Sequence, residues 1–175
     1  MTNLGARVAA GPWRRIVVGV DSSPSSRAAL RWAVAQARLS GQPLLVVHAW
    51  HWMPTSCADP ALTREAAAEE AQRVLDDALG AVRAIAAGIE IGARLVQGNP
   101  ARVLAALGRS STMVVVGAGG LGELAGLLLG SVGLHLVPHS PVPVVVVPCP
   151  PVAPPAAKAV MESVELGLPP ALADV

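Results

Sequence analysis

The 175-residue chain lacks tyrosine and phenylalanine altogether, so four tryptophans are its aromatic side chains. Its hydrophobic fraction of 53% still allows a sizeable core, which must be built from Val, Leu, Ile and Ala. The two cysteines, Cys57 and Cys149, are too few for a disulfide framework and suit the reducing cytoplasm. Charge is scarce too: 14% of residues are charged and the net charge is +1. This balance gives no electrostatic reason to expect nucleic acid or an anionic membrane as a partner.

Hydrophobic runs of the length that targets or anchors a chain are also missing. Residues 1–13 contain Arg7 and no apolar run as long as that of a signal peptide. Residues 124–157 contain no Lys, Arg, Asp or Glu. Glycines and prolines such as Gly130 and Pro138 nevertheless divide them into pieces too short to cross about 30 Å of hydrocarbon. We therefore expect a cytoplasmic protein with no membrane partner.

Three dipeptides predict where helices begin. Each of them, Ser23-Pro24, Asp59-Pro60 and Asn99-Pro100, combines an N-cap side chain with a proline at the first helical position, where its missing N–H costs nothing. We expect helices to begin near residues 24, 60 and 100, and a fourth helix to span about 123–137. Pro138 should kink this fourth helix or end it early.

Short apolar runs rich in Val and Ile alternate with these helices. Most of them lack polar alternation, as strands buried on both faces of a parallel sheet do. The order strand, helix, strand, helix predicts right-handed crossovers and a doubly wound α/β domain. The expected strands are residues 15–20, 44–50, 89–96, 112–116 and 142–147.

Composition divides the chain into three parts. We expect residues 1–13 to be a flexible N-terminal tail and residues 14–148 to form one domain of alternating strands and helices. Residues 149–175 begin with a Pro-rich linker and end in a C-terminal tail.

Two strand ends carry candidate binding residues, because open α/β sheets bind ligands beyond the carboxyl ends of their strands, where the strand order reverses. The first strand ends at Asp21, and the fourth ends at Gly117, which opens the segment GAGGLGELAGLLLGS. Gly117, Gly119 and Gly122 match the dinucleotide fingerprint G-x-G-x-x-G. That fingerprint needs an acidic residue about 20 positions further on, and residues 124–161 contain none. An NAD-dependent oxidoreductase is therefore disfavoured.

A second spacing in the same segment predicts a phosphate-binding loop. Gly117, Gly120 and the pair Gly130-Ser131 are spaced as G-x-x-G-x9-G-S. Glycines at the first two positions let backbone N–H groups approach a phosphate chain closely. The pair Gly130-Ser131 would bring further N–H groups and a hydroxyl to the same anion. The residues therefore predict a nucleotide-binding protein.

These features together resemble the universal stress protein family over residues 14–148. The resemblance rests on VGVDSSPSSRAALRWA at the first strand–helix junction, VVHAW in the second strand, GNP before the third helix, the glycine segment and the final PVPVVVVP. It implies a five-stranded parallel sheet in the order 3-2-1-4-5, flanked by helices. In that order the first and fourth strands are neighbours, so Asp21 and Gly117 would lie where the strand order reverses.

The resemblance also implies a ligand and its contacts. Family members with the full glycine motif bind ATP. By resemblance, Asp21 would lie beside the adenosine and Ala49 would line the adenine pocket. The ribose and phosphates would be held by Gly117, Gly120, Gly130 and Ser131. The family commonly dimerises by pairing the last strand across a two-fold axis, so we expect a homodimer through this strand.

Several positions depart from the family's pattern. Ala118 and Gly119 stand where the family often has Ser and then a basic or imidazole side chain, and Gly133 stands where a hydroxyl residue is frequent. Ala49 replaces a usual Val. The phosphates would rely on backbone N–H groups, on Ser131 and on a divalent cation such as Mg²⁺. Two alternatives stay open: AMP or cyclic AMP as the ligand, and a ligand-free dimeric scaffold that acts through its last strand or its C-terminal tail.

Catalytic motifs are absent from the sequence. The chain has neither G-x-x-x-x-G-K-[ST], which supplies a phosphate-binding lysine, nor the nucleophile elbow G-x-S-x-G. His135 and His139 have the i, i+4 spacing of metal ligands, but no third ligand is evident, so we predict no metal site. We expect a regulatory protein and not an enzyme, with slow ATP hydrolysis at most. Its ATP-bound state would change its dimer or partner surface in a stress response.

Overall fold

The computed structural model describes residues 15–52, 63–119 and 129–148. In these residues five strands form one parallel sheet in the order β3-β2-β1-β4-β5, which confirms the predicted doubly wound α/β fold. The strand order reverses between β1 and β4, because the chain winds outwards from β1 to β3 and then from β4 to β5. The strands are β1 (Ile16–Gly19), β2 (Leu44–Trp50), β3 (Ile91–Gln97), β4 (Met113–Gly117) and β5 (Val144–Val147).

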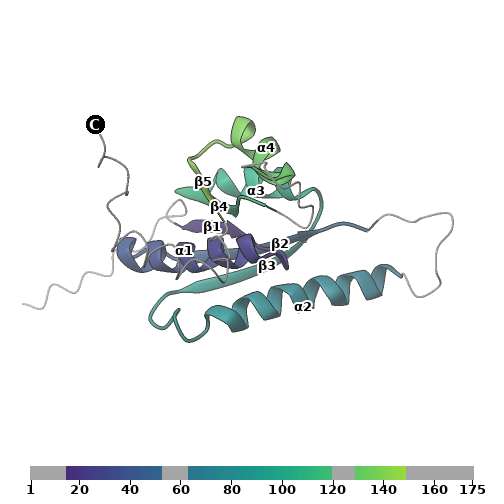
Figure 1. Ribbon diagram of the computed structural model, residues 1–175, viewed down its shortest axis with the longest axis horizontal. Coiled ribbons are helices and arrows are strands. Elements are labelled where there is room, and N and C mark those ends of the chain that lie inside the picture. The colour runs from purple at the N-terminus through teal and green to yellow at the C-terminus, as the bar shows by residue number, and fades with distance from the viewer. Residues whose placement is uncertain (1–14, 53–62, 120–128, 149–175) are drawn as a thin grey trace, which may run out of the picture.

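Two α-helices cover each face of the sheet (Figure 1). On one face lie α1 (Pro24–Ser40) and α2 (Arg64–Val82), and on the other lie α3 (Pro100–Gly108) and α4 (Ser131–Leu136). A 3₁₀ turn, η1 (Val137–His139), follows α4 directly. Because each helix follows a parallel strand, the starts of α1, α3 and α4 all lie at the edge of the sheet where β1, β3 and β4 end.

The central strands are buried on both sides, and the core is aliphatic. Ile16 and Val18 of β1 pack under α1 and α2, whereas Val17 packs under α3 and α4, and all three side chains are fully inaccessible. No tryptophan is among the buried core residues that the structure describes. The edge strand β3 is more exposed, with Ala93 and Arg94 open to solvent. Burial on both faces is therefore a property of the three middle strands.

Two of the three predicted N-caps begin helices where expected. Ser23 accepts a hydrogen bond from the backbone N–H of Ser26 at 3.1 Å, which starts α1. Asn99 accepts one from the backbone N–H of Arg102 at 3.2 Å, which starts α3. At its other end α1 stops at Gly41, whose φ of 64° is left-handed and suits glycine.

The start of α2 corrects the prediction. This helix begins at Arg64, where the Thr63 hydroxyl accepts a hydrogen bond from the backbone N–H of Ala66 at 3.1 Å. The predicted start at Asp59-Pro60 lies outside the described residues. Thr is also a good N-cap residue, and the bond from Ala66 shows that Thr63 fills this role at the start of α2.

The start of α4 differs from the prediction as well. The predicted helix spans 123–137, but α4 begins only at Ser131, because Gly130 has extended backbone angles (φ −67°, ψ 168°) and is its N-cap. The part before residue 129 lies outside the described residues. At the other end α4 stops at Leu136 and Pro138 lies in η1, in agreement with the predicted early end. Across the described ranges, each helix is too short or too polar to cross a bilayer.

Candidate functional site

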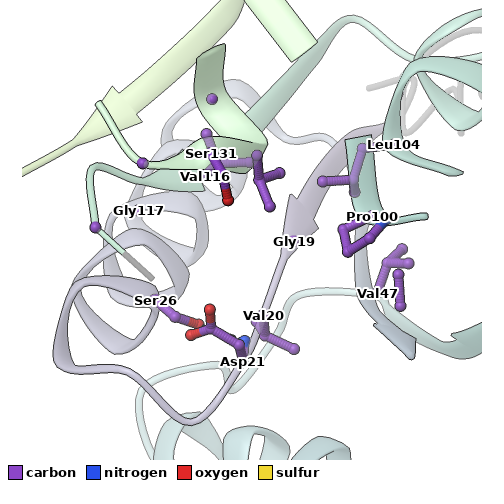
Figure 2. Close-up of a pocket in the computed structure, with 15 residues that line it drawn as sticks. Gly19, Val20, Asp21, Ser26, Val47, Pro100, Leu104, Val116, Gly117 and Ser131 are labelled. Atoms are coloured by element: carbon purple, nitrogen blue, oxygen red, sulfur yellow. Dashed lines mark hydrogen bonds between the residues drawn. The ribbon is translucent and has the colours of Figure 1, made fainter. Parts of the chain in front are cut away.

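A cleft opens beyond the carboxyl ends of β1 and β4, where the strand order reverses (Figure 2). Its residues come from β1, β2 and β4, from the N-terminal parts of α1, α3 and α4, and from the segments that follow β1 and β4. These segments are far apart in the sequence, and the parallel topology brings them to one edge of the sheet.

Five of the six residues predicted to bind the ligand line this cleft. They are Asp21, Ala49, Gly117, Gly130 and Ser131. The sixth, Gly120, lies outside the described residues. Figure 2 shows the Asp21 carboxylate and the Ser26 hydroxyl side by side, with the Ser131 hydroxyl directed into the same space from the opposite wall. The residues singled out at the ends of the first and fourth strands are therefore neighbours in space.

Asp21 is held by the turn that leads into α1. Its Oδ1 accepts a hydrogen bond from the backbone N–H of Ser23 at 2.9 Å, and its own backbone N–H donates to the Ser26 hydroxyl at 2.8 Å. Among the described residues, no donor reaches its Oδ2. Asp21 thus caps a turn, as Asp often does, and keeps one carboxylate oxygen available to hydroxyl groups in the cleft.

Packing alone gives Gly117 a reason to be glycine. A Cβ at this position would lie 2.6 Å from the carbonyl carbon of Ser25 and 2.8 Å from its carbonyl oxygen, which is closer than real Cβ contacts. The end of β4 therefore lies directly against the backbone of α1. Because this contact explains the glycine without a ligand, the residue type at 117 is not by itself evidence of binding.

The two ends of the glycine segment meet beside the cleft. Ala118 donates its backbone N–H to the carbonyl of Val147 at 2.8 Å, and Gly130 donates its backbone N–H to the carbonyl of Ala118. Side chains cap α1, α2 and α3, but α4 has no side-chain cap because its N-cap is Gly130. Among the described residues, the first N–H groups of α4, at Ser131–Gly133, therefore have no side-chain capping acceptor, and these residues line the cleft. Free amides at this place favour an anion.

The remaining wall of the cleft is apolar. Gly19 brings the backbone of β1 close to this wall, since a Cβ there would lie 2.7 Å from the Leu104 side chain. An apolar wall opposite a few polar groups is typical of small-molecule sites. The apolar side chains that line the cleft are Val20, Val47, Ala49, Pro100, Leu104, Val116 and Val132.

Sequence reasoning found only Ala49 of this wall, and it found that residue by resemblance. Pro100 and Leu104 were missed because their place depends on how α3 packs across the sheet. The sequence does contain one signal for Pro100. The motif Gly98-Asn99-Pro100 sets the start of α3, and this start brings Pro100 to the same edge of the sheet as Asp21.

His135 and His139 direct a ring nitrogen back to their own helical turns. Nδ1 of His135 donates to the carbonyl of Ser131 at 2.8 Å, and Nδ1 of His139 donates to the carbonyl of His135 at 2.8 Å. In residues 15–52, 63–119 and 129–148, no group of three His, Cys, Asp or Glu side chains is close enough together to hold a metal ion. These two histidines therefore have no third protein ligand in that part of the chain.

Comparison with known proteins identifies the family. A model described as the universal stress protein family matches residues 12–148. A universal stress protein of Mycolicibacterium smegmatis is 37% identical over 142 residues, which cover 75% of this chain and 47% of that protein. One of Thermus aquaticus, from the 3′ region of QAH/OAS sulfhydrylase, is 33% identical over 141 residues, covering 77% of this chain and 98% of that protein. The chain thus spans about half the length of its curated mycobacterial relatives.

Solved structures of universal stress proteins have a similar fold. UspA from Lactobacillus plantarum aligns with a TM-score of 0.66 at 24% identity, covering 77% of this chain and 97% of that one. A universal stress protein in complex with cAMP aligns at 0.60 and 28% identity, covering 79% and 98%. The Archaeoglobus fulgidus protein in complex with dAMP aligns at 0.59 and 25% identity, covering 77% and 98%. With its five-stranded parallel sheet, its family match and these relatives, the chain belongs to the universal stress protein family.

Proposed function

We propose that this protein is a regulatory protein of the stress response that binds ATP in the cleft between the ends of β1 and β4. The observation that carries the proposal is the meeting of three features in one cleft. Within the described part of the chain, these are a carboxylate oxygen of Asp21 that no donor reaches, an apolar wall, and amides without a side-chain cap at the start of α4. These features complement the three parts of a nucleotide, which are ribose hydroxyls, a planar base and phosphates.

In the proposed complex each part of the nucleotide has its own contacts. Ala49 and the apolar wall receive the adenine, and Asp21 lies beside the adenosine. Backbone N–H groups and one hydroxyl hold the ribose and phosphates, at Gly117, Gly120, Gly130 and Ser131. Because Ala118, Gly119 and Gly133 offer no side-chain donor, Mg²⁺ would balance the remaining phosphate charge.

The nucleotide would act as a regulatory ligand in the cytoplasm and not as the substrate of an efficient enzyme. Within the described residues, Asp21 is the one carboxylate that lines the cleft. In the proposed complex it faces the adenosine, so it is badly placed to activate a water for attack on the γ-phosphate. We therefore expect slow hydrolysis at most. The binding unit would be residues 14–148, with tails at 1–13 and 149–175.

AMP or cyclic AMP is the alternative ligand. A ligand with one phosphate needs fewer donors, which fits a cleft whose anion contacts come mainly from backbone amides. Two similar structures were solved with such ligands, one with cAMP and one with dAMP.

The proposed assembly is a homodimer paired through β5. This strand is an edge of the sheet that residues 15–52, 63–119 and 129–148 form, and all four of its valines are only half-buried. An apolar edge strand with unpaired backbone groups is suited to pairing with another strand. Nucleotide binding would act on this surface through Ala118, which is bonded both to β5 and to the start of α4.

A binding experiment tests the assignment of the glycine segment. Gly130→Ala introduces no backbone strain, because the backbone angles of Gly130 are ones that any residue adopts. We expect the variant to fold normally and its Kd for ATP to rise about tenfold or more, a loss of about 1.4 kcal/mol, because a methyl group would obstruct the approach of the phosphates. Calorimetry with ATP, AMP and cyclic AMP measures this change. Gly80→Ala in α2, where a Cβ meets nothing within 4 Å, is the control.

The outcomes distinguish the candidate functions. Unchanged ATP binding in Gly130→Ala would show that the glycine segment is assigned wrongly. Tighter binding of AMP or cyclic AMP than of ATP by the wild-type protein would favour the alternative ligand, and no nucleotide binding would favour the scaffold. Mass spectrometry of the ligand released on denaturation provides an independent check, since a nicotinamide cofactor would overturn the proposal.

A further inference from the structure

The N-cap and the first turn of α1 contain three serines that are almost completely buried. Ser23, Ser25 and Ser26 are each 4% exposed. Buried hydroxyls need hydrogen-bond partners, because an unsatisfied one costs free energy. Ser26 bonds the backbone of Asp21, which belongs to the site already described. The other two hydroxyls lie against the carbonyl of Gly119, in the segment that follows β4.

Ser25 and Ser23 both reach Gly119, two residues beyond the end of β4. The Ser25 hydroxyl donates to the carbonyl of Gly119, and the Ser23 hydroxyl lies 3.4 Å from the same carbonyl oxygen. The two hydroxyls also lie 3.1 Å from each other. Two residues earlier, Gly117 packs against the backbone of Ser25. The chain that leaves β4 is thus fixed to α1 at two successive points.

The bond from Ser25 also decides which way the Gly119 peptide faces. Gly119 lines the cleft, whereas Ser25 does not. The carbonyl oxygen of Gly119, the negative end of its peptide dipole, is therefore turned away from the cleft and towards α1. A carbonyl oxygen directed into the cleft would repel phosphate, whereas backbone N–H groups attract it. The orientation of this one peptide thus affects the potential felt by an anion.

We infer that Ser25, supported by Ser23, is a positioning residue for the phosphates of the nucleotide. It touches no ligand itself; it holds the carbonyl of Gly119 away from the anion and keeps the exit of β4 fixed beside the start of α4. The inference rests on the proposed nucleotide-binding function. It predicts that the Ser25 hydroxyl contributes to the binding of ATP and contributes little to the binding of adenosine, which has no phosphate.

The experiment compares these two ligands in Ser25→Ala. We expect the Kd for ATP to rise about three- to tenfold, the usual effect of losing one such hydrogen bond, and the Kd for adenosine to change less than about twofold. The matched control is Ser40→Ala, which removes another hydroxyl-to-carbonyl bond of α1, from Ser40 to Gln36 at 2.8 Å, far from the cleft. Calorimetry gives both constants, and urea denaturation gives the stability of each variant. If the alanine variant does not fold, the same two Kd values are measured for Ser25→Cys, whose side chain has a similar volume but is a weaker hydrogen-bond donor.

Each outcome decides the inference. A selective loss of ATP affinity supports it. Equal losses for ATP and adenosine together with lower stability would reduce Ser25 to a packing role, and unchanged ATP affinity would overturn the inference outright. If the wild-type protein binds neither ligand, the proposed function itself fails, which is a distinguishable result because it appears before any substitution is made.

Discussion

At the scale of single residues, the packing role of Gly117 can be measured as a change in stability, apart from its proposed role in binding. An alanine there would place its Cβ 2.6 Å from the carbonyl carbon of Ser25, a backbone atom that cannot rotate away. We expect Gly117→Ala to lower the free energy of unfolding by about 1–3 kcal/mol. Gly80→Ala is the control, since its Cβ meets nothing and alanine is favoured over glycine within a helix by about 0.5–1 kcal/mol. Urea denaturation measures both, and an unchanged stability of Gly117→Ala would contradict the close contact of β4 with α1.

Asp21 allows its capping role to be separated from its proposed binding role. Asparagine keeps an oxygen that accepts from the backbone N–H of Ser23 but removes the negative charge. We expect Asp21→Asn to change stability by less than about 0.5 kcal/mol. Its affinity for ATP should fall about five- to tenfold, because hydrogen bonds from ribose hydroxyls to a charged oxygen are the stronger ones. Calorimetry and urea denaturation measure the two effects.

The companion variant Asp21→Ala loses the acceptor as well as the charge, so both its stability and its ATP affinity should fall. Wild-type ATP affinity in Asp21→Asn would limit Asp21 to its role in the turn.

The residues of the site differ in how far the sequence predicts them. Asp21 and Gly117 follow from the strand ends alone, because the topology brings all carboxyl ends to one edge. Leu104 and Ser25 do not, since their positions depend on how α3 and α1 pack across the sheet. Ser25 is the clearest case: as a residue of a serine-rich turn it looks like a helix start, and its contact with Gly119 appears only in three dimensions.

At the scale of elements, prediction succeeded where local chemistry decides the boundary. Ser23 and Asn99 are each followed by proline, so the starts of α1 and α3 needed no tertiary information. The observed start of α2 is at Arg64, because Thr63 is its N-cap, whereas the predicted start at Asp59-Pro60 lies outside the described residues. The start of α4 was wrong because uncharged apolar residues precede Gly130, so no polar face marks where the helix begins.

At the scale of the whole molecule, the alternation of strands and helices predicts only the doubly wound class. The order 3-2-1-4-5 came from the resemblance, and the pairing of β1 with both β2 and β4 confirms it. Strand order in turn decides which strands are edges. That is why the half-exposure of β5 could not be inferred from its sequence, which is as apolar as that of the buried β4.

In the sheet formed by the described residues, one side of the β5 backbone has no neighbouring strand, and a second copy could use it. Val114 donates to the carbonyl of Pro143, and Ala118 donates to the carbonyl of Val147. Because backbone groups alternate sides along a strand, Val144 and Val146 direct their N–H and C=O groups away from β4 and towards the open edge. A dimer paired through β5 must use these groups.

Proline at position 146 therefore tests the proposed dimer. It removes an edge N–H that a partner strand needs, but no hydrogen bond to β4, and edge strands tolerate proline when its nitrogen faces solvent. We expect Val146→Pro to be monomeric by light scattering after size-exclusion chromatography, with a wild-type circular dichroism spectrum. Val146→Thr keeps both the amide and the branched shape, so it should remain a dimer. If Val146→Pro stays folded and dimeric, the two copies pair through another surface, and β5 is an edge that the fold leaves open for a different reason.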